Sequence, residues 1–198
     1  MPRVSKAETE KNRIAIEQAS SQLFREQGFH GISVADLMGA AGLTHGGFYG
    51  HFESKDALAA IACARAFEES NARWRKRVEE APDKATALAA LIDGYLSTRN
   101  RNAPGSGCPA AALANDVARE SDDKPVRATY HEGLEKLLDV LASIQPGGNA
   151  AANRANAIGE MATLVGALVL SRATQGTPLS NEVLAAAKGY LLARVSKE

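Results

Sequence analysis

Residues 33–55, SVADLMGAAGLTHGGFYGHFESK, constrain the fold of this chain more than any other stretch. Ser33 is a preferred residue at a helix N-cap, and Asp36 follows three positions later, in the place of the acidic partner of a capping box. Apolar side chains then recur at helical spacing, at Val34, Leu37 and Met38. Gly42 can adopt the left-handed conformation that ends a helix. We therefore expect a short helix that stops in a tight turn at Gly42.

A second short helix is expected at residues 45–51, with Thr44 as its cap. Three glycines weaken this segment by about 1 kcal/mol each relative to alanine, namely Gly46, Gly47 and Gly50. Phe48 and Phe52 are four residues apart and can anchor it to the body of the protein. No Asp or Glu occurs from residue 37 to residue 52, so nothing there repels phosphate. This pattern predicts a helix-turn-helix whose second helix enters the major groove of DNA.

The run GFHGISVADLMGAAGLTHGGFYGHFESKDAL at residues 28–58 resembles the DNA-binding domain of the tetracycline-repressor (TetR) family of one-component bacterial transcription regulators. The resemblance implies backbone-phosphate contacts by four residues: Ser33, Tyr49, His51 and Lys55. It also implies that three residues face base edges: Thr44, His45 and Gly46. Many members of the family have a second aromatic residue where this chain has Gly50, so we expect a thinner contact there.

Composition is consistent with a globular helical protein, but net charge does not by itself indicate a nucleic-acid binder. The 198 residues include 23 basic and 23 acidic side chains, whereas DNA-binding proteins often carry an excess of positive charge. The chain has no apolar run long enough to span a membrane and no signal-peptide pattern at its start. Two cysteines 45 positions apart do not form a disulfide framework. We therefore expect a cytoplasmic protein without a membrane partner.

The expected fold class is all-α, with about nine helices in two domains. Residues 1–54 would form a three-helix DNA-binding domain, and residues 55–198 a larger domain that binds an effector and dimerises. Besides the two helices of the motif, apolar periodicity and caps predict helices at residues 7–27, 55–80, 84–101, 109–120, 125–144, 150–173 and 181–195. Ser54 is expected to cap the helix at 55–80, and Ser180 the last one.

The last two expected helices predict a homodimer. The helix at 150–173 is apolar on nearly every side, which indicates neighbours on two sides, and TetR-like proteins dimerise through their last two helices. The expected interface residues are Met161, Val165, Leu168, Val169, Val183, Leu184 and Leu191. The alternative is that both helices simply pack inside a monomer. Dimerisation also suits the function, because one short recognition helix reads too few bases.

The family resemblance implies an effector cavity among the helices of the larger domain. Its candidate lining residues are Phe67, Trp74, Tyr95, Tyr130, His131 and Met161, and plain core is the simpler role for each one taken singly. Cys108 precedes Pro109 at an expected helix start, where the helix dipole favours a thiolate. The segment GCPAAAL resembles a Gly-Cys-(Pro or Leu) segment in one branch of the family, some of whose members respond to electrophiles or oxidants through that cysteine. Cys108 is therefore a candidate sensor.

We expect a DNA-binding transcriptional regulator, most simply a repressor, that leaves its operator when a small molecule, electrophile or oxidant reaches the larger domain. No metal-binding, nucleotide-binding or nucleophile-elbow motif occurs, so we expect no enzyme, cofactor or metal. Two alternatives stay open at this point. One is an all-helical interaction module that has lost DNA binding, and the other is a thiol enzyme in which Cys108 pairs with His131.

Overall fold

The computed structural model describes residues 5–145 and 147–195, and all the regular structure within them is helical. This confirms the all-α fold class. The α-helices are α1 Lys6–Gln27, α2 Val34–Ala40, α3 Lys55–Glu80, α4 Lys84–Tyr95, α5 Thr98–Asn102, α6 Pro109–Arg119, α7 Pro125–Ser143, α8 Ala150–Ala173 and α9 Pro178–Val195, and the 3₁₀ helices are η1 His45–Gly50 and η2 Pro104–Ser106.

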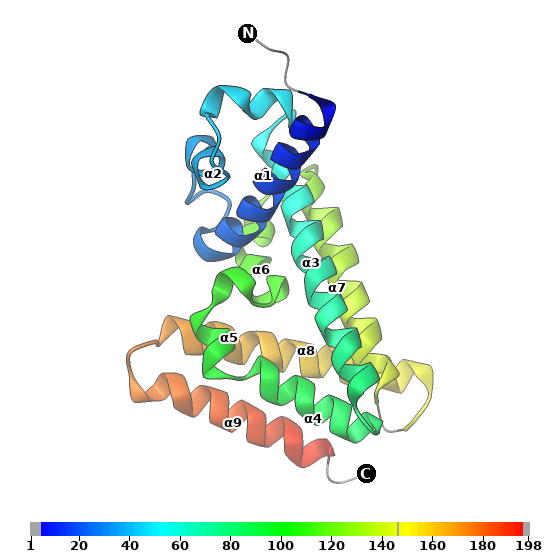
Figure 1. Cartoon of the computed structure of the whole chain (residues 1–198). Helices are drawn as coiled ribbons and strands as arrows, with labels where there is room; N and C mark the ends of the chain where they lie inside the picture. The colour runs from blue at the N-terminus through cyan, green and yellow to red at the C-terminus, as the bar shows by residue number, and fades with distance from the viewer. Residues whose placement is uncertain (1–4, 146, 196–198) are drawn as a thin grey trace.

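The helices form a tall molecule with a broad base (Figure 1). At the top, α1, α2 and η1 pack around the start of α3. From there α3 and α7 run downward side by side, and they form the most extensive contact between two elements. Below them α8 and α9 lie across the base, with α4 packed against α9. The buried residues of all these helices belong to one continuous core.

The caps predicted at Ser33 and Ser54, on either side of the helix-turn-helix, are confirmed. Ser33 accepts a hydrogen bond from the Asp36 amide, and the Asp36 carboxylate accepts one from the Ser33 amide, which completes a capping box. Ser54 accepts from the amide of Ala57 and starts α3 at Lys55. Gly42 has φ +73°, in the left-handed region that a turn needs and a side chain disfavours. Local sequence therefore defines this part of the fold.

The second helix of the motif differs from the expectation in type. Residues 45–50 are a 3₁₀ helix, and the Thr44 side chain makes no capping hydrogen bond. The glycines explain this difference, because each one disfavours an α-helix by about 1 kcal/mol relative to alanine. The segment forms a 3₁₀ helix instead, a type that occurs in short pieces. Thr44 is the N-cap residue of this helix, as predicted, although its side chain does not supply the capping hydrogen bond.

The helix expected at residues 84–101 is broken in two. Leu96 leaves the helical conformation with ψ 44°. The Ser97 hydroxyl donates to the Gly94 carbonyl at 2.9 Å and accepts from the Asn100 amide at 3.2 Å. One serine therefore satisfies the end of α4 and the start of α5, which is how such side chains compete with a continuous helix.

Helix α9 begins at Pro178, three residues before the expected start. Proline suits a first helical position, because its missing N–H would have no partner there. Ser180 is consequently not a cap. It lies inside α9, and its buried hydroxyl donates to the Ser171 carbonyl of α8 at 2.6 Å. This bond fixes α9 against α8.

None of the described helices is long and apolar enough to cross a membrane.

Candidate nucleic-acid interface

Two buried aromatic rings hold η1 against the body of the protein. Phe48 is fully buried and Phe52 is 4% exposed, and their ring centroids lie 5.8 Å apart. Because these rings point inward, the other side of η1 faces solvent, and Tyr49 is 72% exposed. The residues expected to face base edges are also exposed, namely Thr44, His45 and Gly46.

The glycines of η1 are not explained by the protein's own packing. Neither Gly46 nor Gly50 has any atom within 4 Å of the position that a Cβ would occupy, and Gly47 meets only the Met38 methyl group at 3.6 Å. None of the three has a positive φ. Since neither backbone conformation nor crowding requires them, their effect is to leave a smooth exposed surface to which another molecule's backbone can come close.

Arg13 of α1 fixes the end of η1. Its guanidinium donates to the His51 carbonyl at 2.9 Å and lies over the Phe52 ring, 4.9 Å from the centroid. The sequence did not single out this contact, which joins residues 38 positions apart. His51 is half-buried, unlike Tyr49.

Two residues near the start of α2 that were expected to contact phosphate, Ser33 and Lys55, already form hydrogen bonds within the protein. The Ser33 hydroxyl donates to the Asp36 carboxylate at 2.5 Å. This bond and the backbone bond from Ser33 hold the pKa of Asp36 below its ordinary value. The Lys55 ammonium donates to the Ile32 carbonyl at 2.5 Å. An ammonium has three hydrogens, so Lys55 keeps donors for a further ligand beside Ser33.

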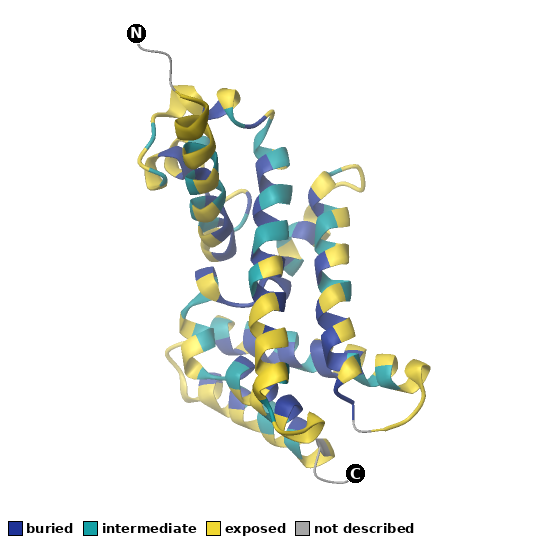
Figure 2. Ribbon diagram, turned by 45° about the vertical axis from the view of Figure 1, so that its right-hand side comes forward, coloured by how far each residue is buried: buried dark blue, intermediate teal, exposed yellow. Residues whose placement is uncertain are grey.

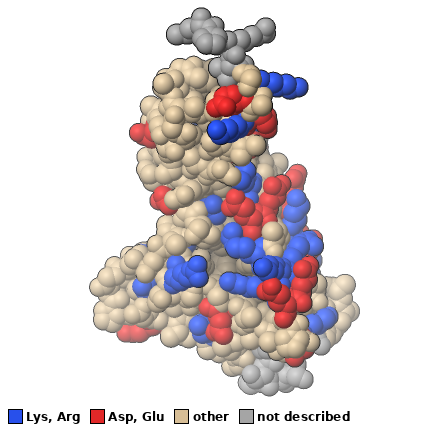
Figure 3. All heavy atoms as spheres, viewed as in Figure 1, with Lys and Arg blue, Asp and Glu red and all other residues tan. Residues whose placement is uncertain are grey.

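Charge is unevenly distributed over the molecule (Figure 3). The end formed by α2 and η1, at the upper left, carries few charged side chains, whereas both signs gather along α3 and α7 at the lower right. The surface of η1 therefore offers hydroxyl, imidazole and backbone groups without carboxylates. Such a surface is compatible with a phosphate backbone even in a chain of zero net charge.

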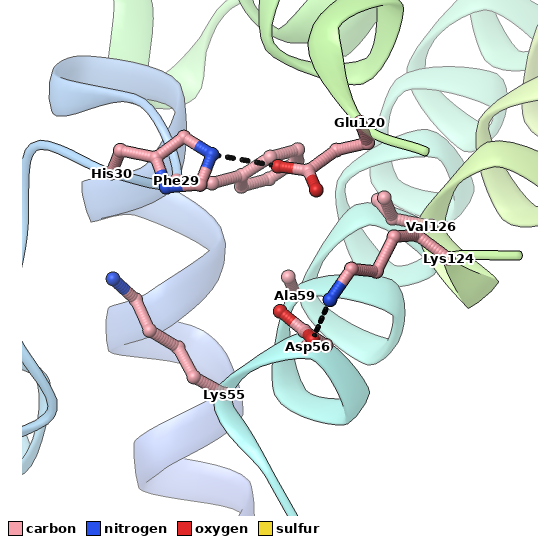
Figure 4. Close-up of a pocket in the computed structure, with 8 residues that line it drawn as sticks. All are labelled: Phe29, His30, Lys55, Asp56, Ala59, Glu120, Lys124 and Val126. Atoms are coloured by element: carbon pink, nitrogen blue, oxygen red, sulfur yellow. Dashed lines mark hydrogen bonds and ion pairs between the residues drawn. The ribbon is translucent and has the colours of Figure 1, made fainter. Parts of the chain in front are cut away.

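Three contacts join the helix-turn-helix region to α6 and the segment after it. Figure 4 shows the His30 ring pointing to the Glu120 carboxylate, at 2.8 Å, and the Lys124 ammonium pointing to Asp56, at 2.5 Å. In addition, the Phe29 amide donates to Asp116 at 3.1 Å. These polar links surround a small pocket and connect α6 to the turn just before α2.

Most residues expected to line an effector cavity share the core of the larger part of the chain. Phe67, Trp74, Tyr95 and Met161 are buried. The rings form edge-to-face pairs, Phe67 with Tyr130 at 5.3 Å and Trp74 with Tyr95 at 6.0 Å. Apolar packing therefore explains these positions without a ligand.

His131 does not belong with this group. Its side chain is 74% exposed, and its ring lies 3.6 Å from the Glu135 carboxylate on the same helix. Cys108, by contrast, is buried. The expected pocket role of His131 is therefore wrong, and the imidazole of a Cys108–His131 catalytic pair faces solvent instead. No group of three or more potential metal ligands occurs in the described residues.

Cys108 is the N-cap residue of α6, and its side chain makes no capping hydrogen bond. Arg25 donates to the Gly107 carbonyl at 3.0 Å, and Arg172 donates to the Asn100 carbonyl at 3.0 Å. Burial lowers the pKa of both guanidinium groups. Glu69 is the main opposing influence at Arg25 and Tyr95 at Arg172, and Cys108 adds to both in the same direction. Burial and then Cys108 raise the pKa of Tyr95. Cys108 thus lies among two cations and a phenol.

The expected dimer residues fall into two groups. Four are buried within their own chain: Met161, Leu168, Leu184 and Leu191. The other three are half-exposed: Val165, Val169 and Val183. The sequence analysis missed the large apolar side chains that α8 and α9 do expose, namely Ile158, Leu170, Leu179 and Tyr190. Helical spacing found two apolar sides on α8, but it could not tell which one the chain itself covers.

The sequence of this chain is similar to those of known helix-turn-helix transcription regulators. Residues 16–61 match the profile of the bacterial regulatory proteins of the tetR family. The HTH-type transcriptional repressor DhaR of a Mycobacterium species is 26% identical over 105 residues, which are 53% of this chain and 52% of DhaR. An uncharacterised HTH-type transcriptional regulator of Mycobacterium tuberculosis is 28% identical over 171 residues, covering 81% of this chain and 84% of that protein.

Solved structures share the fold over nearly the whole chain. A TetR-family regulator from Agrobacterium tumefaciens has a TM-score of 0.77 at 24% identity, covering 94% of this chain and 98% of the other. The reduced form of Escherichia coli NemR has a TM-score of 0.76 at 19% identity, covering 91% and 94%. The helix-turn-helix of this chain thus matches the tetR family in sequence, and nearly the whole chain shares the fold of solved TetR-family regulators.

Proposed function

We propose that the protein is a homodimeric repressor that binds operator DNA through η1 and leaves it when an effector acts on the larger part of the chain. The observation that carries this proposal is the surface of η1, which is exposed, free of carboxylates and smoothed by glycines that its own fold does not need. Residues 1–54 would form the DNA-binding domain and residues 55–198 the effector and dimerisation domain.

In this proposal η1 lies in the major groove, with Thr44, His45 and Gly46 toward the base edges. Tyr49 and Lys55 reach the phosphates on either side, because the Tyr49 side chain is largely exposed and the Lys55 ammonium keeps free donors. Ser33 and His51 complete the phosphate contacts, Ser33 by giving up its bond to Asp36. A dimer would place two copies of η1 about 34 Å apart, one helical turn of DNA.

The dimer is supported by the apolar face that α8 and α9 expose. Exposure of these side chains to water is unfavourable, because burying apolar surface stabilises by about 25 cal/mol per Å². Four of the six most exposed large apolar residues of the described chain lie on these two helices. A second copy that covers this face would bury them around a two-fold axis.

Selection of bound sequences from random double-stranded DNA tests the DNA-binding proposal. The purified protein should enrich a sequence with two related half-sites, and footprinting should then show two protected segments about one helical turn apart. Tyr49→Ala should weaken binding to that site without unfolding the protein, because Tyr49 is 72% exposed. Lys84→Ala is the control, because Lys84 is exposed on α4, outside η1 and outside the exposed face of α8 and α9. Failure to enrich any sequence would favour the alternative of an interaction module without DNA binding.

Cys108 supports a second, finer proposal, that a thiol-reactive electrophile or an oxidant is the effector. Its thiol sits at the start of α6, and α6 carries Asp116 and is followed by Glu120, both of which bond to the helix-turn-helix region. A bulky adduct on a buried thiol would displace α6 and strain those bonds. Cys63 is the internal comparison, because burial raises its pKa to about 12 and keeps it unreactive.

Alkylation with iodoacetamide tests this second proposal. Modification of Cys108 should lower operator affinity in the wild type, and Cys108→Ser should make affinity insensitive to the reagent. Mass spectrometry after digestion identifies which cysteine has reacted. Unchanged affinity after complete modification of Cys108 would show that the thiol is not the sensor, while leaving the DNA-binding proposal intact.

A further inference from the structure

An open groove lies between α3 and α7 on the outer side of the molecule, away from η1 and from the exposed face of α8 and α9. Its volume is about 300 Å³, which is enough for a small molecule. The two helices stand side by side in both ribbon views, and the lower half of α3 is exposed along its outer surface (Figures 1 and 2). The groove opens to solvent, because its charged lining residues are exposed, namely Glu68, Arg75, Glu132 and Lys136.

The floor of the groove is apolar and closely packed. Phe67 and Gly133 form it, and Gly133 has no side chain because the Phe67 ring occupies that space. Ala64 and Ala72 extend the apolar surface along α3. This floor suits a short hydrocarbon chain.

The rim is charged, and its charges are arranged by sign. Both helices run in the same direction, since Asp56 meets Lys124 at one end of the pair while Val78 and Val140 line one pocket at the other. Glu68 and Glu132 therefore lie at the upper end of the groove, and Arg75 and Lys136 at the lower end. None of these four side chains forms an ion pair within the described residues. Charged neighbours on α3 do pair elsewhere, as Lys76 and Glu80 do at 3.7 Å.

A buried acceptor without a partner lies between the two ends. Asn71 lines the groove and is only 6% exposed. Its Nδ2 donates to the Phe67 carbonyl at 3.0 Å. A carbonyl can only accept, so this bond fixes which end of the amide is nitrogen. The Oδ1 atom is then left buried with no hydrogen-bond donor in the described chain. Such an atom is costly unless a ligand or water satisfies it.

We propose that this groove binds a small linear zwitterion of the ω-amino acid class. Its ammonium group lies between Glu68 and Glu132 and donates to Asn71 Oδ1, and its carboxylate lies between Arg75 and Lys136. The rise of an α-helix separates Glu68 from Arg75 by about 10 Å and Glu132 from Lys136 by about 6 Å. A chain of five or six carbon atoms over Phe67 spans this separation. The site is independent of the DNA-binding proposal.

The probe is 6-aminohexanoate, compared with hexanoate and hexylamine, each of which lacks one of the two charges. Binding is followed on the full-length protein, without DNA, by backbone amide chemical shifts in NMR titrations. We expect saturable shifts at residues 64–75 and 129–136, with 6-aminohexanoate binding about ten-fold more tightly than either single-charge compound. Equal binding of all three compounds, shifts elsewhere, or no saturation would overturn the proposal.

Two variants test the orientation of the ligand. Glu132→Gln should weaken 6-aminohexanoate and hexylamine by about three- to five-fold and leave hexanoate unchanged, as the loss of one exposed ion pair implies. Lys136→Gln should weaken 6-aminohexanoate and hexanoate by a similar factor and leave hexylamine unchanged. Lys84→Gln, an exposed lysine on α4, is the matched control and should change nothing. All three side chains are exposed, so these variants should fold normally. The same loss for every compound in both groove variants would contradict the assigned orientation.

Discussion

The ring of Phe67 on α3 lies directly against the backbone of Gly133 on α7, in the space that a side chain at position 133 would occupy. This approach lets α3 and α7 pack closely, and they form the most extensive contact between two elements of the fold. The contact matters for function because α3 reaches from the helix-turn-helix region to the base of the molecule, and α7 is its main support.

Gly133→Ala should therefore destabilise the protein by about 1–3 kcal/mol, the usual result of forcing extra volume into a packed interior. Unfolding in urea, followed by circular dichroism, measures this change. Gly39→Ala is the matched control, because it lies in α2 with nothing within 4 Å and should stabilise by up to about 1 kcal/mol. Equal stability of the two variants would show that α3 and α7 separate easily.

Gly46→Ala and Gly50→Ala should separate stability from DNA binding. Both positions are open, so alanine should keep or raise the free energy of unfolding. The added methyl groups should nevertheless lower affinity for the selected operator. Gly42→Ala gives the opposite result for stability, a loss of about 1 kcal/mol, because φ is +73° there. Undiminished operator affinity in both η1 variants would mean that DNA does not approach these glycines.

The capping box at Ser33 and Asp36 should make stability depend on acid. Hydrogen bonds from Ser33 lower the pKa of Asp36 in the folded protein relative to its ordinary value of 3.8. The ionised carboxylate therefore stabilises the fold above that pH, and this contribution is lost as the pH falls through the lowered pKa. The difference in unfolding free energy between the wild type and Asp36→Asn should be largest near neutral pH and should shrink below 3.8. A difference that does not vary with pH would contradict the role of the charge.

Substitution of Ile158 and Tyr190 together by arginine should yield a monomer. These side chains are 47% and 59% exposed on α8 and α9, so the chain itself does not need them for its core. Sedimentation velocity measures the state of assembly. Ile14→Arg on α1 is the control, since Ile14 is exposed to a similar degree, 41%, on a helix outside the proposed interface. A dimer that survives the double substitution would place the interface elsewhere.

The sequence predicted those features that depend on neighbouring residues. Ser33, Gly42 and Ser54 define their caps and turn within three or four positions, and all three are where they were expected. The break at Ser97 was missed because apolar periodicity continues across it. The Ser97 hydroxyl interrupts the helix by bonding to the Gly94 carbonyl and the Asn100 amide.

Contacts between distant positions were beyond the sequence. His30 and Glu120 are 90 residues apart, and Asp56 and Lys124 are 68 apart. No local pattern marks these pairs, because side-chain partners across a fold depend on how helices cross. The same reason explains why Leu168 was assigned to the dimer interface, although it is buried in the core of its own chain. The expected DNA contacts remain predictions, whereas the exposure of Tyr49 and the burial of Phe48 agree with the amphipathic reading of η1.

Helix α3 runs without interruption over 26 residues, from Lys55 to Glu80. A rod of that size is about 39 Å long, and its upper tip is tied to the carbonyl of Ile32 by the ammonium of Lys55. A tilt of about 5° pivoting at the lower end would swing this tip by about 3 Å, as the same helical rise implies. A small displacement at the lower end of α3, too small to disturb the core, would therefore move η1 enough that it no longer fits the major groove.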